Sequence, residues 1–448
     1  MATRAGRAPG RAAPILFRLC LAALLAGPAV AARAQAPDAL TLDDVLREAH
    51  ASNARLPIPA TDLLAAREKV SEARAERWLK VAVEGDFIYA PPNGYDPAIT
   101  NAGEFRLQAV GRQPLYDGGA KRAAVLRGEA DADAAGARYR IAEKDVELDV
   151  RSRYAEWAAA DSEAAARSEG IDRLQRYRSL LQSRRASGQG VGADVLKTDV
   201  RLATERASLV DAEGRRESAR IALNALMGRD PSAPLRLVSL PLPSTGEPPA
   251  LPAGAPPEVA EAEAATRSAA ADVATARAEA KPHLNLQGDV GFLGSDTSRW
   301  VPADLLARDP NATFGDRVRR DTGYSLALTF TWNVFDFGAI RARIRQAELK
   351  LASAKQNVVW QTQEARRQRA QAESTLANVR EQIRILSDAA PSARDAYLEA
   401  ESRYRGGAAT AFEVLEAYAA SVDAAVKLGD ALSRWRIAQA LAARWGSP

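Results

Sequence analysis

The chain has 448 residues, of which 47% are hydrophobic, with 61 basic and 57 acidic residues. The first 34 residues hold five of the bases and none of the acids, so the rest carries 56 bases against 57 acids. The apparent basicity therefore belongs to the N-terminus, and no nucleic-acid partner is expected. Cys20, the single cysteine, also lies there, which excludes disulfides and cysteine-ligated metals beyond it.

Residues 1–34 have the pattern of a secretory signal peptide. Arginines precede an apolar stretch from Leu19 to Val30, and small residues follow up to Ala34. Cleavage after Ala34 would leave Gln35 as the first mature residue. The stretch is too short to span a membrane as a helix. We therefore expect an exported chain.

The rest of the chain contains an internal repeat. Motifs recur at a constant offset of 219 residues over about 80 residues, which indicates a duplicated unit. Upstream the offset is 203, so the second copy has 16 additional residues between its two alternating segments. The matched positions include Asp117 with Asp336, Gly119 with Gly338, Gly188 with Gly407, and Asp194 with Glu413.

Each copy has two segments of about ten residues in which apolar and polar side chains alternate. Length, alternation and aromatic residues near the ends are typical of transmembrane β-strands. Four half-buried strands of a soluble sandwich are the alternative. The apolar positions are Val81, Val83, Phe87, Phe105 and Leu107 in the first copy, and Leu284, Leu286, Val290, Tyr324, Leu326, Leu328 and Phe330 in the second.

Long helices should follow both pairs of strands. Residues 120–187 contain no proline, and residues 339–405 contain only Pro391, which should kink or break the helix locally. A helix of this length would extend about 100 Å, so the helices must pack along one another as coiled coil. In each copy a glycine-containing break follows, and the chain then returns as a second helix. These second helices end near Met227 and Trp445.

The expected organisation is a signal peptide at 1–34, a first repeat at 35–230, a linker at 231–257 and a second repeat at 258–448. The linker holds nine prolines. Each repeat should contain a helix, two strands and a long helical hairpin.

Four strands per chain are too few to close a barrel, since the smallest closed barrels use about eight. Open sheet edges are not tolerated in lipid, so the chain should oligomerise to complete the barrel. The helices would continue on the other side of the membrane. A polar lumen would be lined by Glu84, Asp86, Arg106, Arg112 and Asp289.

The chain contains four stretches, in order and partly duplicated, that match one known family: LTLDDVLREAHASN at 40–53, PLYDGG at 114–119, WNVFDFG at 332–338 and YRGGAATAFEVLEA at 404–417. Over essentially its whole mature length the chain resembles the TolC-type outer-membrane efflux proteins, the outer membrane factors. The resemblance implies a mixed α and β membrane protein: a homotrimer whose twelve strands, four per chain, form one β-barrel in outer-membrane lipid, continued by an α-helical coiled-coil tunnel in the periplasm. It also implies a channel of a tripartite efflux or type I secretion system, working with a periplasmic adaptor (membrane fusion) protein and an inner-membrane transporter.

The same resemblance implies a gate where the hairpin tips close the tunnel. Its residues would be Tyr404, Glu413 and Glu416, with Asp194 bonding across to Tyr404. Glu413 and Glu416 share a helical face, so three chains would place six carboxylates around a cation-attracting constriction. The best-known members have Asp at both positions. They also have a basic residue where this chain has Ala409, so the basic member of the polar contacts that hold the tips shut, the latch, is not found at that position. Ordinary solvated helix surface is the alternative for both glutamates.

Two further sets of residues are implied. Adaptor docking is expected at the hairpin tips, where glycines let a partner approach the backbone; a helix C-cap is the alternative, and both can hold. The strand-to-helix turns should mark where membrane strand becomes periplasmic helix. The docking residues are Ser187, Gly188, Gln189, Gly407 and Ala408, and the turn residues are Asp117, Gly118, Gly119, Asp336 and Gly338.

No catalytic constellation is found. His50 and His283 are isolated, and the GQGVG stretch lacks the Lys-Ser/Thr of a phosphate loop. We therefore expect no enzyme, cofactor or metal site. An exported coiled-coil structural or adhesion protein without channel activity is the alternative function. It shares the helices, but it does not account for four strands with polar inner faces.

Overall fold

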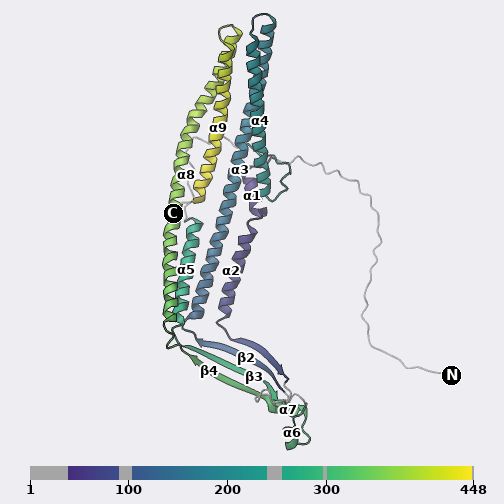
Figure 1. Ribbon diagram of the computed structural model, residues 1–448, viewed down its shortest axis with the longest axis vertical. Coiled ribbons are helices and arrows are strands. Elements are labelled where there is room, and N and C mark those ends of the chain that lie inside the picture. Colours follow the sequence, from purple (N-terminus) through teal and green to yellow (C-terminus); the bar gives the residue numbers. More distant parts are fainter. Residues whose placement is uncertain (1–38, 90–102, 240–254, 296–299, 446–448) are drawn as a thin grey trace, which may run out of the picture. The chain divides into compact units, whose positions relative to one another are not determined.

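The computed structural model describes residues 39–89, 103–239, 255–295 and 300–445 (Figure 1). The expected signal peptide, part of the first outer loop and most of the proline-rich linker lie outside these ranges. The described residues belong to one structural unit, which is mostly helical and contains one four-stranded antiparallel sheet. None of the described helices is both long and apolar enough to cross a membrane.

The first repeat begins with a capped helix. Thr41 accepts a hydrogen bond from the backbone of Asp44, whose carboxylate accepts one from Thr41 in return, so two unpaired backbone donors are satisfied. The elements of this repeat are in the predicted order, except that two helices and not one precede the strands. They are α1 (Leu42–Ser52), α2 (Pro57–Ala75), β1 (Lys80–Ile88), β2 (Glu104–Tyr116), α3 (Ala120–Ala186) and α4 (Gly192–Leu226).

The second repeat has one helix before its strands, where the first has two, and it has two additional short helices between the strands. These two helices lie in the segment that holds the 16 additional residues, and the second of them starts with a capping box between Thr313 and Asp316. Helices of six and eight residues are too short for periodicity to reveal. The elements are α5 (Pro257–Ala278), β3 (His283–Ser295), α6 (Ala303–Arg308), α7 (Phe314–Asp321), β4 (Thr322–Thr331), α8 (Ala339–Arg405) and α9 (Ala411–Trp445).

Pro391 does not break α8, which continues from Ala339 to Arg405. Proline removes one backbone donor, a local cost in a helix whose other turns are hydrogen-bonded. α8 packs against both α5 and α9: Ala347 clusters with Val273 of α5 before Pro391, and the Tyr397 ring contacts Tyr418 of α9 after it. The expectation of a break was therefore wrong, and the expected kink stays a prediction.

The sheet has the order β1-β2-β3-β4, and every neighbouring pair is antiparallel. The central pair, β2 with β3, joins the two repeats. One row of directly opposed residues crosses all four strands through Val83, Ala109, Val290 and Tyr324. Since directly opposed residues share a face, the apolar positions of the four strands form one side of the sheet.

The long helices pack through small side chains. α3 lies against α4, α5 and α9, and α8 lies against α5 and α9 (Figure 1). Alanine has a small side chain, which lets helix axes approach closely. Alanines buried along α3, α5 and α9 include Ala134, Ala137, Ala155, Ala160, Ala264, Ala276, Ala431 and Ala442.

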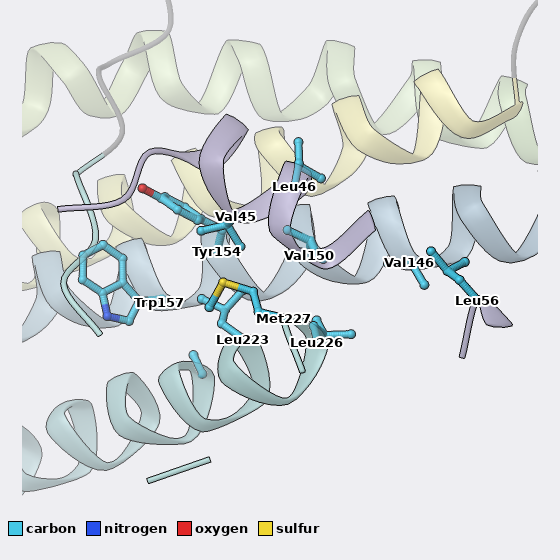
Figure 2. Packing of buried hydrophobic residues seen from close by; sticks show 12 residues of the cluster. Val45, Leu46, Leu56, Val146, Val150, Tyr154, Trp157, Leu223, Leu226 and Met227 are labelled. Atoms are coloured by element: carbon cyan, nitrogen blue, oxygen red, sulfur yellow. The ribbon is translucent and has the colours of Figure 1, made fainter. Parts of the chain in front are cut away.

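Larger side chains gather in two clusters at different levels of the bundle. In the first, Val45 of α1, Val150 and Tyr154 of α3 and Leu223 of α4 are fully buried together (Figure 2). The hydroxyl of Tyr154 donates to the carbonyl of Val238 at 2.6 Å, which ties the start of the linker to α3. The second cluster lies between the two hairpins near their tips and contains four tyrosines: Tyr177, Tyr397, Tyr404 and Tyr418.

Candidate functional site

The two hairpin tips have the same backbone geometry. α3 ends with Gly188 at φ 76°, and α8 ends with Gly407 at φ 77°. In each, an amide beyond the glycine donates back into the last turn: Gln189 to the carbonyl of Arg184 at 2.9 Å, and Ala408 to that of Arg403 at 2.8 Å. These are glycine C-caps in the left-handed conformation. A Cβ at either glycine would meet no atom within 4 Å, so both tips are open to an approaching partner.

Tyr404 is buried between the hairpins and is held there by the first hairpin. Its ring meets that of Tyr177 edge-on, with the centroids 5.4 Å apart, and the guanidinium of Arg184 lies 4.8 Å from the Tyr404 centroid. Arg184 also donates to the carbonyl of Arg405 at 2.6 Å. One arginine of α3 therefore binds both an aromatic ring and a C-terminal carbonyl of α8.

Asp194 lies in the first turn of α4, where its backbone carbonyl accepts a bond from the Thr198 hydroxyl at 2.8 Å. No hydrogen bond joins Asp194 to Tyr404 within the described residues of this single chain. Burial raises the pKa of Tyr177, with smaller contributions from Tyr404 and Asp194. Asp194 therefore lies within electrostatic reach of the buried tyrosine pair, although the cross-hairpin bond is not formed here.

Glu413 and Glu416 are exposed on the first turns of α9, while Val414 between them is fully buried. Glu413 has a local partner: its carboxylate accepts from the Thr410 hydroxyl at 3.0 Å, and its amide donates to that hydroxyl at 3.3 Å. This is a capping box. Glu413 thus stabilises the start of α9 and still presents its charge to solvent.

The two strand-to-helix turns are built by equivalent aspartates. The Asp117 carboxylate accepts bonds from the amides of Gly119 and Lys121 at 2.9 and 2.7 Å. The Asp336 carboxylate accepts from Gly338 and Ile340 at 3.0 and 2.6 Å. Each carboxylate therefore accepts hydrogen bonds from otherwise unpaired amides at the start of a 67-residue helix. Its negative charge also interacts favourably with the positive N-terminal end of the helix dipole.

The face of the sheet opposite the apolar side carries the charges predicted for a lumen. Arg106 forms an ion pair with Asp86, and Arg112 pairs with Glu84 at 2.8 Å across the β1–β2 ladder. Asp289 of β3 accepts a hydrogen bond from Ser325 of β4. The charges on this face are therefore largely neutralised in pairs between adjacent strands.

Metal-binding geometry is not found in the part of the chain that the structure describes. No group of three or more His, Cys, Asp or Glu side chains there could hold a metal ion. The described residues form a polar sheet face, two capped turns and two hairpin tips that Arg184 holds together.

Most of the chain matches one known protein family. Residues 45–229 and 254–447 match the family described as outer membrane efflux protein. The two segments together make up most of the chain. The chain belongs to the outer membrane efflux protein family. Membership assigns the chain to the outer membrane, in a family of transport channels and not of enzymes.

Solved structures share its fold. The outer-membrane channel OprN is 23% identical, with 90% of each chain covered and a TM-score of 0.77. VceC from Vibrio cholerae is 20% identical over 91% of this chain and 96% of its own, with a TM-score of 0.76. The open state of MtrE from Neisseria gonorrhoeae is 17% identical over 91% and 90%, with a TM-score of 0.70. No curated protein matches the chain.

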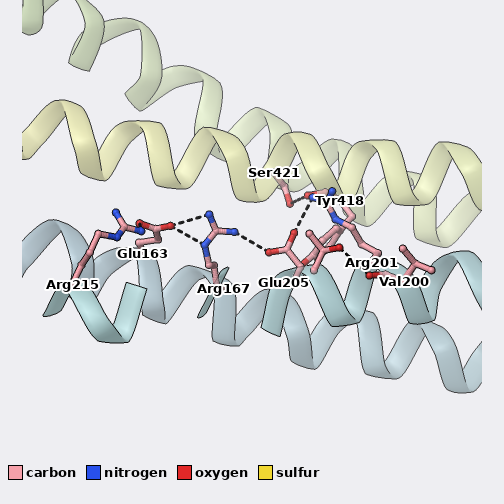
Figure 3. A network of polar contacts seen from close by, with 9 residues as sticks. Glu163, Arg167, Val200, Arg201, Glu205, Arg215, Tyr418 and Ser421 are labelled. Atoms are coloured by element: carbon pink, nitrogen blue, oxygen red, sulfur yellow. Dashed lines mark hydrogen bonds and ion pairs between the residues drawn. The ribbon is translucent and has the colours of Figure 1, made fainter. Parts of the chain in front are cut away.

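A buried ionic network in the efflux protein was not predicted (Figure 3). Arg167 of α3 bonds to Glu163 of α3 at 2.8 Å and to Glu205 of α4 at 3.0 Å, and both glutamates are buried. Arg201 and Arg215 of α4 complete the pairing of these carboxylates. Burial acts to lower the pKa of Arg167, but the two glutamates outweigh it and raise the pKa. The i,i+4 spacings were visible in the sequence; the burial was not.

Arg184 was missed for a related reason. Its contacts are with Tyr404 and Arg405, more than 200 residues later in the chain, and no local pattern connects them. The only sequence signal is the matched position of the two tips in the repeat.

Proposed function

We propose that the chain is one protomer of a trimeric outer-membrane channel-tunnel that exports substrates from an inner-membrane pump. The observation that carries the proposal is the two-sided sheet. One face exposes Val83, Leu326 and Phe330 to more than 60% each, and the other carries paired charges. A sheet that is apolar outside and polar inside fits a wall between lipid and water.

The unpaired edges of the sheet support a trimer. β1 and β4 are the outer strands, and each pairs on one side only among the described residues. In lipid an open edge leaves backbone groups without partners, so β1 of one copy would pair with β4 of the next. Three copies would close twelve strands into one barrel.

The helices also expose apolar surfaces that neighbouring copies would cover. α4 and α8 each expose large apolar side chains that the single chain leaves uncovered, which is expected of faces buried in an assembly. Three such bundles side by side would enclose a tunnel below the barrel. The residues, all at least half exposed, are Leu196, Val200 and Val210 on α4 and Leu349, Val359 and Trp360 on α8.

The gate we propose lies at the hairpin tips. Glu413 and Glu416 from three chains would form a ring of carboxylates that attracts cations. Tyr404 and Asp194 would belong to the latch, and Arg184 would supply its basic half from the first hairpin. This assignment would account for Ala409, because the family's basic position is then no longer needed.

The proposed partners are a periplasmic adaptor and an inner-membrane transporter, with docking at Ser187, Gly188, Gln189, Gly407 and Ala408. The open glycine caps support this choice. Gly407 has a positive φ, so replacing it would disturb the cap as well as the surface. Ala408→Trp changes only the exposed surface. We expect it to abolish export in cells while trimer assembly stays normal; export at parental level would refute docking at this tip.

The test of the proposed function is planar-bilayer recording of the purified protein, together with gel mobility of unheated and heated samples. A closed-tip tunnel predicts small cation-selective channels and a heat-sensitive trimer band. Folded protein that yields neither channels nor trimers, and is recovered from the soluble periplasm, would support a coiled-coil scaffold instead.

A further inference from the structure

The short helices α6 and α7 connect β3 to β4 at the end of the sheet that lies away from the long helices (Figure 1). Among the described residues, the first repeat has no helix between its strands. Such a loop could fold over the lumen and narrow the channel, or fold over the lipid-facing side and leave the channel open. The contacts of α7 decide between the two arrangements.

α7 packs on the apolar side of the sheet. The guanidinium of Arg317 lies 4.8 Å from the ring centroid of Phe105 on β2. Directly opposite Phe105 on β3 is Gly294, where a Cβ would lie 2.7 Å from Oδ2 of Asp321. Phe105 lies four residues before Ala109, a member of the apolar row. Since residues separated by two or four positions in a strand share a face, α7 covers the apolar side and not the polar side.

A buried ionic network holds the two short helices in place. Arg317 and Asp321 are paired at 3.3 Å, and their side chains are only 3% and 7% exposed. Arg320 donates to Asp321 at 2.7 Å and also pairs with Asp304 of α6 at 3.0 Å. Charges buried this deeply are tolerated only when they are paired and hydrogen-bonded. The pairing therefore fixes α7 against the sheet and α6 against α7.

The exposed side of α6 and α7 combines arginines with aromatic rings. The side chain of Arg319 is 86% exposed and lies 3.7 Å from Asp316, too far for a hydrogen bond. Arg308 is exposed and makes no ion pair with any residue that the structure describes. Beside them the rings of Trp300 and Phe314 meet edge-on, with centroids 5.7 Å apart, and both remain exposed. This surface fits a ligand that carries both anionic groups and acyl chains.

We propose that α6 and α7 form a binding surface for lipid A, the phosphorylated glycolipid of the outer leaflet. The inference rests on the proposed function, in which the sheet spans the outer membrane. Arg308 and Arg319 would bind the phosphates, because guanidinium groups match phosphate oxygens in charge and geometry. Trp300 and Phe314 would lie against the acyl chains.

The position of α7 on the sheet favours this ligand over a second copy of the chain. A neighbouring copy would join at the edge strands β1 and β4, whereas Arg317 and Asp321 lie over β2 and β3 in the centre. The end of the sheet away from the periplasmic helices lies at the outer leaflet in the proposed function. What covers the lipid-facing side there is the headgroup layer of that leaflet.

The location is tested by labelling single cysteines with sulfonatoethyl methanethiosulfonate, a small anionic thiol reagent. Val318→Cys and Ser325→Cys are made in a Cys20→Ala background, because the chain has no other cysteine. Val318 is exposed on α7, and Ser325 lies on the polar side of β4, where its hydroxyl donates to Asp289. Labelling is done in detergent and confirmed by mass, and the channels are then recorded in planar bilayers.

We expect the label at position 325 to change the single-channel conductance and the label at position 318 to leave it at the parental value. A label at 318 that changes conductance as much as the label at 325 would overturn the proposal, because α7 would then cover the lumen. Parental protein that does not conduct, or a label at 325 without effect, would instead refute the proposed function.

Binding is tested by titrating the purified protein in detergent with bisphosphorylated lipid A and measuring the complex by native mass spectrometry. Each arginine near an anionic lipid surface contributes about fivefold, so Arg308→Gln with Arg319→Gln should weaken binding about 25-fold. Arg341→Gln with Arg345→Gln removes the same charge from the exposed start of α8, at the other end of the sheet, and should bind as the parental protein does. With monophosphorylated lipid A the difference between the parental protein and the loop variant should shrink. Absence of parental binding, parental affinity in the loop variant, or equal weakening in both variants would overturn the proposal.

Discussion

Tyr418 of α9 carries a buried hydroxyl that has no hydrogen-bond partner in the described structure. An unsatisfied buried hydroxyl costs about 1–3 kcal/mol, so Tyr418→Phe should raise the free energy of unfolding by roughly 1 kcal/mol. Tyr154→Phe is the matched control. Its hydroxyl donates to Val238, so its loss should destabilise by about 1 kcal/mol. Denaturant unfolding in detergent would measure both, and destabilisation of both variants alike would contradict the assignment.

The same substitution has a pH signature. Burial raises the pKa of Tyr418 above its usual value of 10.0, with a further contribution from Glu205. The unfolded chain therefore releases this proton near pH 10 while the folded chain keeps it, and the stability contributed below pH 10 is lost as the pH rises toward the folded pKa. Tyr418→Phe should show a shallower loss of stability above pH 10. Burial raises the pKa of Tyr397 to about 12, so that residue would continue to contribute.

Single site residues were predictable only where their partners are local. Thr410 and Glu413 have the spacing of a capping box, and the structure forms it. The environment of Tyr404 was not predictable, because Arg184 and Tyr177 reach it from another helical hairpin. The predicted contact of Asp194 with Tyr404 depends in the same way on how two hairpins are placed. Such contacts follow from packing and not from sequence spacing.

Among the helices, Gly170 of α3 lies directly against two side chains of α9. A Cβ there would lie 2.5 Å from the Tyr418 hydroxyl oxygen and 3.2 Å from a methyl of Val422. Tyr418 is fully buried and packed against Tyr397, so it cannot turn away. Gly170→Ala should therefore destabilise the protein by about 1–3 kcal/mol through overpacking.

Two further variants make the Gly170 test specific. Gly214 in α4 has nothing within 4 Å of its would-be Cβ, so Gly214→Ala should stabilise by about 0.5–1 kcal/mol through helix propensity. Adding Tyr418→Phe to Gly170→Ala removes the clashing oxygen and should restore most of the loss. If the double variant is no more stable than Gly170→Ala, the Tyr418 contact is not the cause. Thermal unfolding in detergent provides the measurement.

Element boundaries were predicted well where the chain marks them chemically. The second long helix was expected at residues 339–405 and runs from Ala339 to Arg405, because Asp336 and Gly338 start it and Gly406 and Gly407 end it. The alternation of apolar and polar residues predicted the positions of the four strands, because one face of the sheet is apolar and the other is polar. Pro391 misled the prediction: long-range packing holds α8 together at a residue whose local preference is to interrupt a helix.

At the scale of the whole molecule, the proposed carboxylate ring gives a prediction about ion selectivity. The double variant Glu413→Gln, Glu416→Gln should shift the reversal potential in a salt gradient toward zero and weaken block by divalent cations. Glutamine at position 413 can keep the capping box, so the charge is removed without loss of the helix start. Glu68→Gln with Glu72→Gln on α2 removes as much charge far from the tips. An unchanged reversal potential in the tip variant would mean that both glutamates are ordinary surface.

The contact between the hairpins gives the last prediction. Arg184 binds the ring of Tyr404 and the carbonyl of Arg405, so it must release both if the second hairpin moves away from the first. Contacts of this kind are worth about 1–3 kcal/mol, which would shift an equilibrium between closed and open tips by roughly 5- to 150-fold. Arg184→Gln should therefore raise the mean single-channel conductance in planar bilayers. Arg185→Gln removes the same charge from the neighbouring residue, whose side chain lies near Gly192 of its own hairpin, and should leave conductance unchanged. Equal conductance in the two variants would mean that the clamp only stabilises the fold, whereas a rise in Arg184→Gln alone would identify it as a component of the gate.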